Sequence, residues 1–503
     1  MGPKRIAAIL LMQFACGIAA AELLARAGGG DSFSGGGGGG GSGGGGDGDI
    51  GALIYLIVQL IRLLLWLWME GGPVGKVLCL AIIVALAWGG FWWWRQSQRE
   101  KQRAIEGKVY RGARAPGRGA QERGFASILE RDPNFSRVLF LDFAHLIFTK
   151  LHESRGKGDG SIAPYLTPTL REKLNQSGAT ASNIVVGATE IESAEVTDAE
   201  QRISVRFKAN LLEQSGGESR RLLLEQRLTF ARPHGIVTRS PEQTLKLGCP
   251  NCGSPEEPKL DGKCPSCGTL TARGAAGWQV KTLQTLRKQA ALEPLISSGG
   301  VEEGTGAPTV VSPLLQSQLR ALKVRDPAFN LTALTQRVQH MFMEVQRGWS
   351  EADASRLRPF ETDTLFDAHR YWIERFVEQG VRNVLEEVTI ERIQLAKLEH
   401  DAWYDAATVR IFASMRDWYR DRNGKTVGGN PKVIRRFSEY WTLIRRAEAA
   451  GKPSGDPSRC PSCGAPLDRV NMAGICEYCG SKVISGTFDW VLSSITQDEE
   501  YAG

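Results

Sequence analysis

Two sets of four cysteines constrain this 503-residue chain more than any other feature of its sequence. Each set consists of two Cys-x-x-Cys pairs separated by a short loop, and a glycine follows every pair. Tight turns of this kind aim both sulfurs at one ion, and four thiolates form the closed tetrahedral site of a structural Zn²⁺. We therefore predict two structural zinc ions, with the ligands Cys249, Cys252, Cys264 and Cys267 in the first set and Cys460, Cys463, Cys476 and Cys479 in the second.

Disulfide bonds in an oxidising compartment are the alternative use of an even number of closely spaced cysteines. The paired spacing and the proline and glycine turns favour zinc over disulfides. Four thiolates leave no open position on the metal, so we expect these sites to stabilise the fold rather than to catalyse a reaction.

The cysteine sets belong to a larger repeat. Residues 131–135 (RDPNF) recur at 325–329 (RDPAF), an offset of 194 residues (325 − 131). Trp278 and Trp490 follow the last cysteine of their sets at the same distance, and residues 225–232 (EQRLTFAR) parallel 439–446 (EYWTLIRR). The shared order and spacing indicate duplication of one module.

The positive charge of the chain is concentrated in one stretch. The net charge is +7, and residues 95–123 contain nine Lys or Arg against three Glu, an excess of six (9 − 3). The two repeated modules are therefore close to neutral. This distribution argues against a protein whose main role is to coat nucleic acid.

The N-terminal part has the pattern of an export signal and a tether. Residues 1–21 combine two basic residues, an apolar run and small residues suited to cleavage, and we assign them as a signal peptide. An uncleaved anchor is the alternative. Residues 22–49 are rich in glycine and form a flexible tract.

Two apolar segments follow. Residues 77–94 are long enough to span a bilayer and end in aromatic residues, so we predict a transmembrane helix. Residues 50–69 contain Gln59 and Arg62 and are either interfacial or transmembrane. The basic juxtamembrane linker, 95–130, predicts contact with anionic membrane lipid and places the globular part on the cytoplasmic face of a bacterial inner membrane. A hairpin with two crossings would place it outside.

The globular part is predicted to be α+β. Helices precede a curved antiparallel sheet in each of two cone-like modules, and a zinc ribbon is inserted between the last two strands. We expect Asp132 to cap the first helix, with Pro133 in its first turn. We assign the first module to residues 131–290 with its ribbon at 249–267, a linker to 291–324, and the second module to 325–497 with its ribbon at 460–479.

Five short stretches of the second module carry a resemblance to a known family: 403–405 (WYD), 412–414 (FAS), 424–425 (GK), 436–437 (RF) and 439–445 (EYWTLIR). With these residues the second module resembles the Tim44-like family, the bacterial relatives of the matrix-side tether of the mitochondrial inner-membrane translocase. The resemblance covers 325–496 well and 131–286 more faintly. It implies a cone-shaped fold like that of nuclear transport factor two, contact with anionic lipid and a non-enzymatic scaffold role. The zinc ribbons and the duplication depart from the usual single module.

No catalytic or small-molecule cofactor residues are assigned. None of the six histidines stands beside Asp, Glu or Cys at the spacing of a catalytic or metal site. His145 and His152 share a helix face, where we expect a packed or solvated pair.

Aromatic residues of the second module either fill its core or line a pocket. A pocket enzyme would need a carboxylate among them, and Asp405, Asp417 and Glu439 are the candidates. We favour core packing, with Glu439 paired to an arginine such as Arg435.

We predict a non-enzymatic, membrane-anchored scaffold that binds protein clients and anionic lipid, in protein translocation or membrane-protein assembly. A pocket enzyme of the isomerase or hydrolase kind and a ribosome- or RNA-contacting tether are the alternatives. The mixed charge around the cysteine sets favours a protein partner over nucleic acid. Six tryptophans in the second module against Trp278 in the first suggest that Trp441 helps a concave face there to bind clients, and that the first module is a spacer.

Overall fold

The structure is a computed structural model. It describes residues 118–157, 160–249, 277–290, 305–452 and 454–498, with short pieces between 66 and 88, within 251–271 and at 500–503.

Most of the N-terminal assignments lie outside the described residues. This holds for the signal peptide 1–21, the tract 22–49, nearly all of the segments 50–69 and 77–94, and the basic linker up to residue 117. Among the described residues, no helix is both long and apolar enough to cross a membrane. The signal and the membrane anchor therefore remain predictions.

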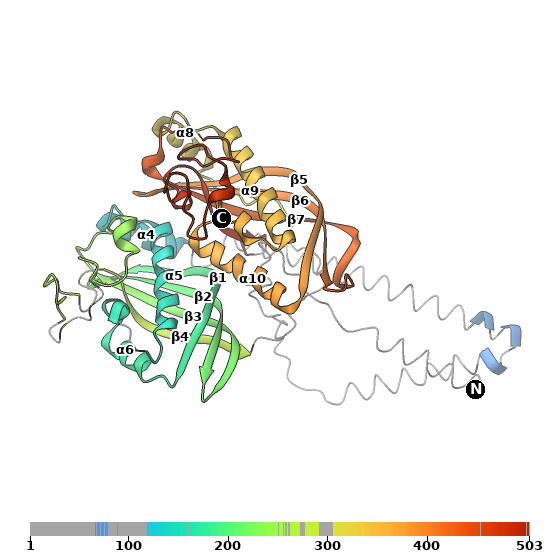
Figure 1. Cartoon of the computed structure of the whole chain (residues 1–503), viewed down its shortest axis with the longest axis horizontal. Helices are drawn as coiled ribbons and strands as arrows, with labels where there is room; N and C mark the ends of the chain where they lie inside the picture. The colour runs from blue at the N-terminus through green and yellow to red at the C-terminus, as the bar shows by residue number, and fades with distance from the viewer. Residues whose placement is uncertain are drawn as a thin grey trace. The chain divides into compact units, whose positions relative to one another are not determined.

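The first module, taken from here on as residues 118–290, contains a four-stranded antiparallel sheet whose strands lie in chain order (Figure 1). The first cysteine set lies between the last two strands. The elements are α4 (Arg118–Arg131), α5 (Arg137–Glu153), α6 (Pro168–Asn175), β1 (Ala179–Val196), β2 (Glu200–Ser215), β3 (Glu218–Pro233), α7 (Pro241–Thr244) and β4 (Gln279–Ala290).

The second module, residues 305–498, repeats this plan with a second antiparallel sheet in chain order (Figure 1). Its cysteine set again separates the last two strands. The elements are α8 (Leu315–Arg325), α9 (Leu331–Glu351), α10 (Asp363–Gln379), β5 (Val381–His400), β6 (Tyr404–Asp421), β7 (Thr426–Arg446) and β8 (Val491–Gln497).

The prediction of an α+β fold is confirmed, and two helices fall where linkers were expected. The linker was assigned to residues 291–324, yet the Ser312 N–H donates to the carbonyl of Ala396 on β5, and α8 follows. Likewise α4 lies within the predicted basic linker. The first assignment rested on the Pro, Gly and Ser content of residues 297–312, and the second on the basic charge of residues 95–123. Neither feature excludes a short helix that covers one edge of a sheet.

The first long helix of each module begins at an equivalent polar residue. Ser136 caps α5, and its Oγ accepts the N–H of Leu139 at 3.1 Å. Asn330 caps α9, and its Oδ1 accepts the N–H of Thr332 at 2.8 Å. Both caps satisfy N–H groups that the helix leaves unpaired. The prediction that Asp132 caps α5 is therefore wrong, because the helix begins one turn later.

Each sheet buries one face against its helices. In the first module, alternate residues of β2 (Ile203, Val205 and Phe207) are fully buried and pack with apolar residues of α5 and α6. In the second module, alternate residues of β7 pack with α9 and α10. Period-two burial on strands opposite amphipathic helices explains why the sequence forms these layers.

Candidate metal centres

The structure brings together the four cysteines of the first set. Their sulfur atoms all lie within 4.8 Å of one another. The Sγ atoms of Cys249 and Cys267 are 3.7 Å apart, as are those of Cys252 and Cys264. Cys249 and Cys264 are buried and the other two exposed, so the site sits at the surface with one wall against protein.

The second set has the same geometry. Sγ of Cys460 lies 3.9 Å from that of Cys479, and Sγ of Cys463 lies 4.0 Å from that of Cys476. Sulfurs placed about 2.3 Å from a tetrahedral ion are about 3.8 Å apart, whereas disulfide-bonded sulfurs are about 2.05 Å apart. Both quartets therefore have the spacing of a four-thiolate metal site, and both could hold a thiophilic ion.

Glycines close all four Cys-x-x-Cys turns. Each donates its backbone N–H to the carbonyl of the first cysteine of the pair, at 2.7–2.9 Å. Each also adopts a left-handed backbone conformation with φ between 70° and 76°, which residues other than glycine rarely adopt. The prediction that glycine after each pair makes these turns is confirmed for Gly253, Gly268, Gly464 and Gly480.

Neighbouring polar groups favour the thiolate form of one cysteine in each set. The side chain of Thr269, with its Oγ1 3.2 Å from Sγ of Cys267, and its backbone N–H lower the pKa of Cys267 to about 5. The side chain and backbone of Ser481 lower the pKa of Cys479 to about 6. Thiolate is the form that binds a metal ion.

The second ribbon is built into its module. Val470, Val483 and Ile484 form a buried cluster with Cys460, Cys476 and Val491, the first residue of β8. Arg358, 1% exposed, donates from Nε to the carbonyl of Met472 at 2.8 Å. The sequence contained no signal for Arg358, because it lies 114 residues from its partner in the ribbon.

The first ribbon is held mainly by polar contacts of the backbone. The Gly248 N–H donates to the carbonyl of Ser161 at 3.1 Å. The hydroxyl of Tyr165 donates to the carbonyl of Lys246 at 3.2 Å. Among the described residues around this ribbon, no apolar cluster like that of the second ribbon is found. The two ribbons share a metal geometry and differ in attachment.

The repeated RDP motif forms a buried ion pair in each module. In the first module Asp132 Oδ2 accepts from Arg232 Nη2 at 2.7 Å, and neither side chain is more than 1% exposed. Gln201 also accepts from Nη2 at 2.7 Å, and the guanidinium lies over the ring of Trp278 at 4.4 Å. Burial lowers the pKa of Arg232, and the Asp132 carboxylate opposes that shift.

The second module contains the same cluster. Asp326 Oδ2 accepts from Arg445 Nη2 at 2.7 Å, and Arg445 lies over the ring of Trp490 at 4.8 Å. Asp405, 3.3 Å from Arg445, takes the place of Gln201. Burial alone would favour the neutral acid, but His400 and the nearby arginines hold the pKa of Asp405 below its ordinary value. The structural equivalents are thus Arg232 and Arg445, whereas the sequence comparison had aligned Arg232 with Arg446.

The three carboxylates considered for a catalytic pocket all have partners in the core. Asp405 belongs to the cluster above. Asp417 Oδ1 accepts from Asn383 Nδ2 at 2.7 Å. Glu439 is 0% exposed, and its Oε1 accepts the indole N–H of Trp441 at 2.8 Å. Arg435, the arginine that we expected beside Glu439, lies 3.5 Å from Asp417.

The aromatic residues of the second module mostly fill its core. Trp441 is 0% exposed and packs against Phe342 with ring centres 5.4 Å apart. Trp349, Trp372 and Trp490 are also buried. The expected role of Trp441 on a client-binding face therefore gains no support from its packing.

Fold and sites together define a protein of two α+β modules, each with a four-cysteine ribbon set between its last two strands. Residues 315–454, within the second module, match the model of the Tim44-like domain. The match begins at α8 and ends before Cys460, so the second ribbon and the entire first module lie outside it. A comparison with curated proteins gave no match.

Proposed function

We propose that this chain is a non-enzymatic scaffold of protein translocation or membrane-protein assembly, attached to the cytoplasmic face of a bacterial inner membrane. The observation that carries the proposal is the Tim44-like domain at residues 315–454. The partners of the candidate carboxylates support it further, because Glu439 and Asp417 are both engaged in hydrogen bonds inside the core.

The cysteine quartets give this scaffold two structural zinc sites. Four thiolates with no carboxylate or imidazole suit Zn²⁺ among the common ions. Elemental analysis of the purified chain should give about two equivalents of zinc. Cys463→Ser should lose one equivalent and leave the first site loaded. Intact disulfides without metal would contradict both the zinc assignment and the cytoplasmic location.

The basic stretch at 95–123 suits contact with anionic head groups. Each cation near such a surface contributes on the order of 1 kcal/mol, and salt weakens the effect. Native mass spectrometry of the chain extracted in mild detergent should show retained anionic phospholipid in preference to neutral phospholipid, with less retained at high salt. Equal retention of both lipid classes would argue against this contact.

The scaffold role is tested by capture of partners in intact membranes. Photocrosslinking groups placed on exposed side chains such as Val433 of β7 and Tyr478 of the second ribbon should yield crosslinks to secretory precursors or to assembly machinery. The same group at the exposed Leu129 of α4 shows whether the first module also contacts these partners. Turnover of small substrates together with an absence of protein crosslinks would favour the enzyme alternative.

A further inference from the structure

The second module has a depression where the end of α10, the start of β5 and the turn after β6 meet. Its volume is about 470 Å³, which is comparable to that of small-molecule sites. Three of the lining residues are arginines, Arg382, Arg420 and Arg422, and Asp421 is the one acidic residue among them. The lining therefore has an excess of two positive charges (3 − 1).

Two of these arginines stand directly opposite each other in the sheet. Arg382 of β5 pairs with Arg420 of β6 in the antiparallel register, so both side chains project from one face with Cβ atoms about 5 Å apart. The third arginine, Arg422, lies against the end of α10, because a Cβ atom built on Gly380 would be 2.4 Å from its Nε. Like charges on opposed residues destabilise a sheet, so this arrangement is unfavourable without a counter-charge.

The described residues supply no such counter-charge, since none of their carboxylates lies within ion-pair distance of the three arginines. Arg382 donates from Nε to the carbonyl of Ser350, which is a neutral partner. Asp421 is engaged in the turn, where its Oδ1 accepts the N–H groups of Asn423 and Lys425, both at 2.9 Å. The ends of α9 and α10 also line the depression, but each contributes only about half a negative charge. The site therefore stays positive.

The first module forms the same corner without these charges. Thr180 pairs with Gln214 at the position of the opposed arginines. Gly216 follows the last residue of β2, as Arg422 follows the last residue of β6. A Cβ atom built on Gly178, which precedes β1, meets no heavy atom within 4 Å. The fold itself therefore does not require the three arginines, and a bound anion would relieve their repulsion.

We propose that this depression binds a small molecule that carries a phosphate monoester. The phosphate takes the place between the two strands, because its oxygens can accept hydrogen bonds from Arg382 and Arg420 at once and its charge at pH 7 is close to −2. Val377, which is 54% exposed, and Val381 give the rest of the ligand an apolar wall. This inference does not depend on the scaffold function.

Binding is measured on the full chain in a nonionic detergent by ligand-observed NMR, with glycerol 3-phosphate as the probe. We expect a Kd of about 1 mM at low salt. Glycerate, which has a single negative charge, and uncharged glycerol should bind at least about tenfold more weakly. Equal binding of glycerate and the phosphate, or no binding of the phosphate, would overturn the proposal.

Arg420→Gln copies Gln214 of the first module and should weaken the binding of glycerol 3-phosphate at least about tenfold. The matched control is Arg436→Gln, which removes an exposed arginine of the same sheet. Arg436 pairs with Ser414, six residues along β6 from Arg420 (420 − 414), so this variant should bind as the natural chain does. Unchanged binding by a folded Arg420→Gln chain would disprove the assignment of the site.

Scanning calorimetry tests the repulsion by a readout other than binding. Without a ligand, Arg420→Gln should raise the unfolding temperature of the second module by about 1–3 °C, because one of two opposed charges is gone. Glycerol 3-phosphate should raise the unfolding temperature of the natural chain and leave that of the variant unchanged. A variant less stable than the natural chain would show that Arg420 serves the fold and would contradict the proposal.

The head group of a membrane lipid is the competing source of a phosphate. Native mass spectrometry of Arg420→Gln, extracted in mild detergent, separates the two sources. Retention of anionic phospholipid equal to that of the natural chain supports a soluble ligand. A loss of retained lipid in this variant but not in Arg436→Gln would assign the depression to the membrane surface and overturn the small-molecule assignment.

Discussion

The two modules of this chain share a plan and differ in what they bury. Both combine a four-stranded sheet, a capped helix, a buried Asp–Arg–Trp cluster and a four-cysteine ribbon. The second buries additional charge, with Arg337 and Asp489 in its interior and Asp405 in its cluster.

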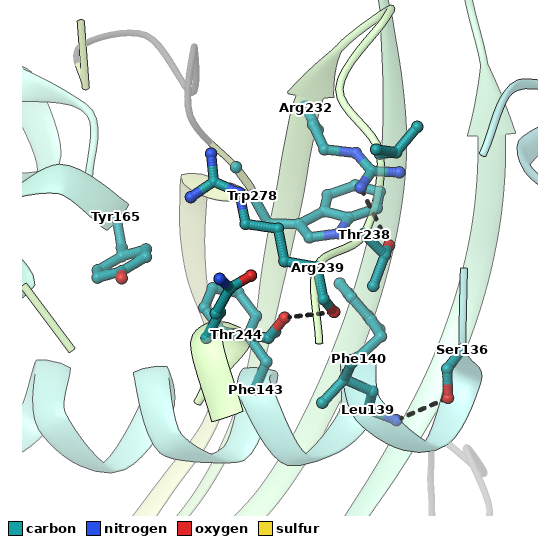
Figure 2. Close-up of a pocket in the computed structure, with 13 residues that line it drawn as sticks. Ser136, Leu139, Phe140, Phe143, Tyr165, Arg232, Thr238, Arg239, Thr244 and Trp278 are labelled. Atoms are coloured by element: carbon teal, nitrogen blue, oxygen red, sulfur yellow. Dashed lines mark hydrogen bonds between the residues drawn. The ribbon is translucent and has the colours of Figure 1, made fainter. Parts of the chain in front are cut away.

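The first module has uncharged residues at the equivalent positions. At the offset of 194 residues that aligns the helix caps, Phe143 corresponds to Arg337, and Gly277 stands where the second module has Asp489, directly before the buried tryptophan. A small cavity lies there, with Phe143 and Trp278 in its wall (Figure 2). After duplication, the same backbone thus supported a charged interior in one copy and a largely apolar cavity in the other.

Loss of the metal should separate the modules most strongly. Cys463→Ser and Cys252→Ser remove equivalent exposed ligands. Structural zinc sites contribute on the order of 10 kcal/mol to the folding of small zinc domains. Because the second ribbon shares its buried cluster with β8, its loss should destabilise the whole second module by several kcal/mol. The loss of the first ribbon should remain local to residues 245–271.

Hydrogen exchange read by mass spectrometry reports each module separately and therefore measures this difference. Faster exchange should appear throughout β7, β8 and α10 in Cys463→Ser. In Cys252→Ser it should be confined to the ribbon. If faster exchange extended equally far into the module in both variants, the different attachment of the two ribbons would have no consequence for stability.

The buried clusters provide the next comparison. Asp132→Asn leaves Arg232 buried with only neutral partners, which should cost about 3–5 kcal/mol of unfolding free energy. Asp326→Asn leaves Arg445 with Asp405 at 3.3 Å, so its cost should be smaller, about 1.5–3 kcal/mol. Urea denaturation of the two variants measures both values. A larger loss in Asp326→Asn would mean that Asp405 does not compensate for Asp326.

The two histidines of α5 should weaken the first module as pH falls, an effect that Asp142 of the same helix opposes because burial raises its pKa to about 7. Burial lowers the pKa of His152 to about 3 and that of His145 to about 4. The second module has Gln346 and Gln339 at these positions, at the offset of 194. The unfolded chain binds protons below the ordinary histidine pKa of 6.5, whereas the folded module stays neutral until about pH 4. Each histidine therefore contributes stability that is present above pH 6.5 and is lost as pH falls, by about 1.4 kcal/mol per pH unit.

Hydrogen exchange measures this loss of stability. Its rates in α5 and α9 are compared between pH 7 and pH 4.5, after correction for the intrinsic effect of pH on exchange. His152→Gln copies the residue of the second module and should flatten the pH dependence of α5, with Gln226 at 2.8 Å still available as a partner. An unchanged slope in that variant would assign the acid sensitivity to other groups.

The sequence by itself determined the two cysteine quartets, the duplication and the order of the main helices and strands. These features are local: the Cys-x-x-Cys spacing specifies a turn with a glycine at positive φ, and period-two burial specifies a strand. Of the two histidines that we expected to form a packed or solvated pair, His152 is buried with its Nε2 2.8 Å from Gln226 Oε1, and His145 is partly exposed.

Only the tertiary structure decided which residues meet across long sequence distances. It showed that Arg232 of the first module and Arg445 of the second occupy equivalent positions. It paired Asp132 with Arg232, 100 residues away, instead of with the N-terminus of α5, and it placed Trp441 in the core. It also showed that Phe143 and Gly277 face one cavity. Each residue is unremarkable in its own segment, because a cavity arises where two segments leave the same space unfilled, and packing between segments leaves no period in the sequence.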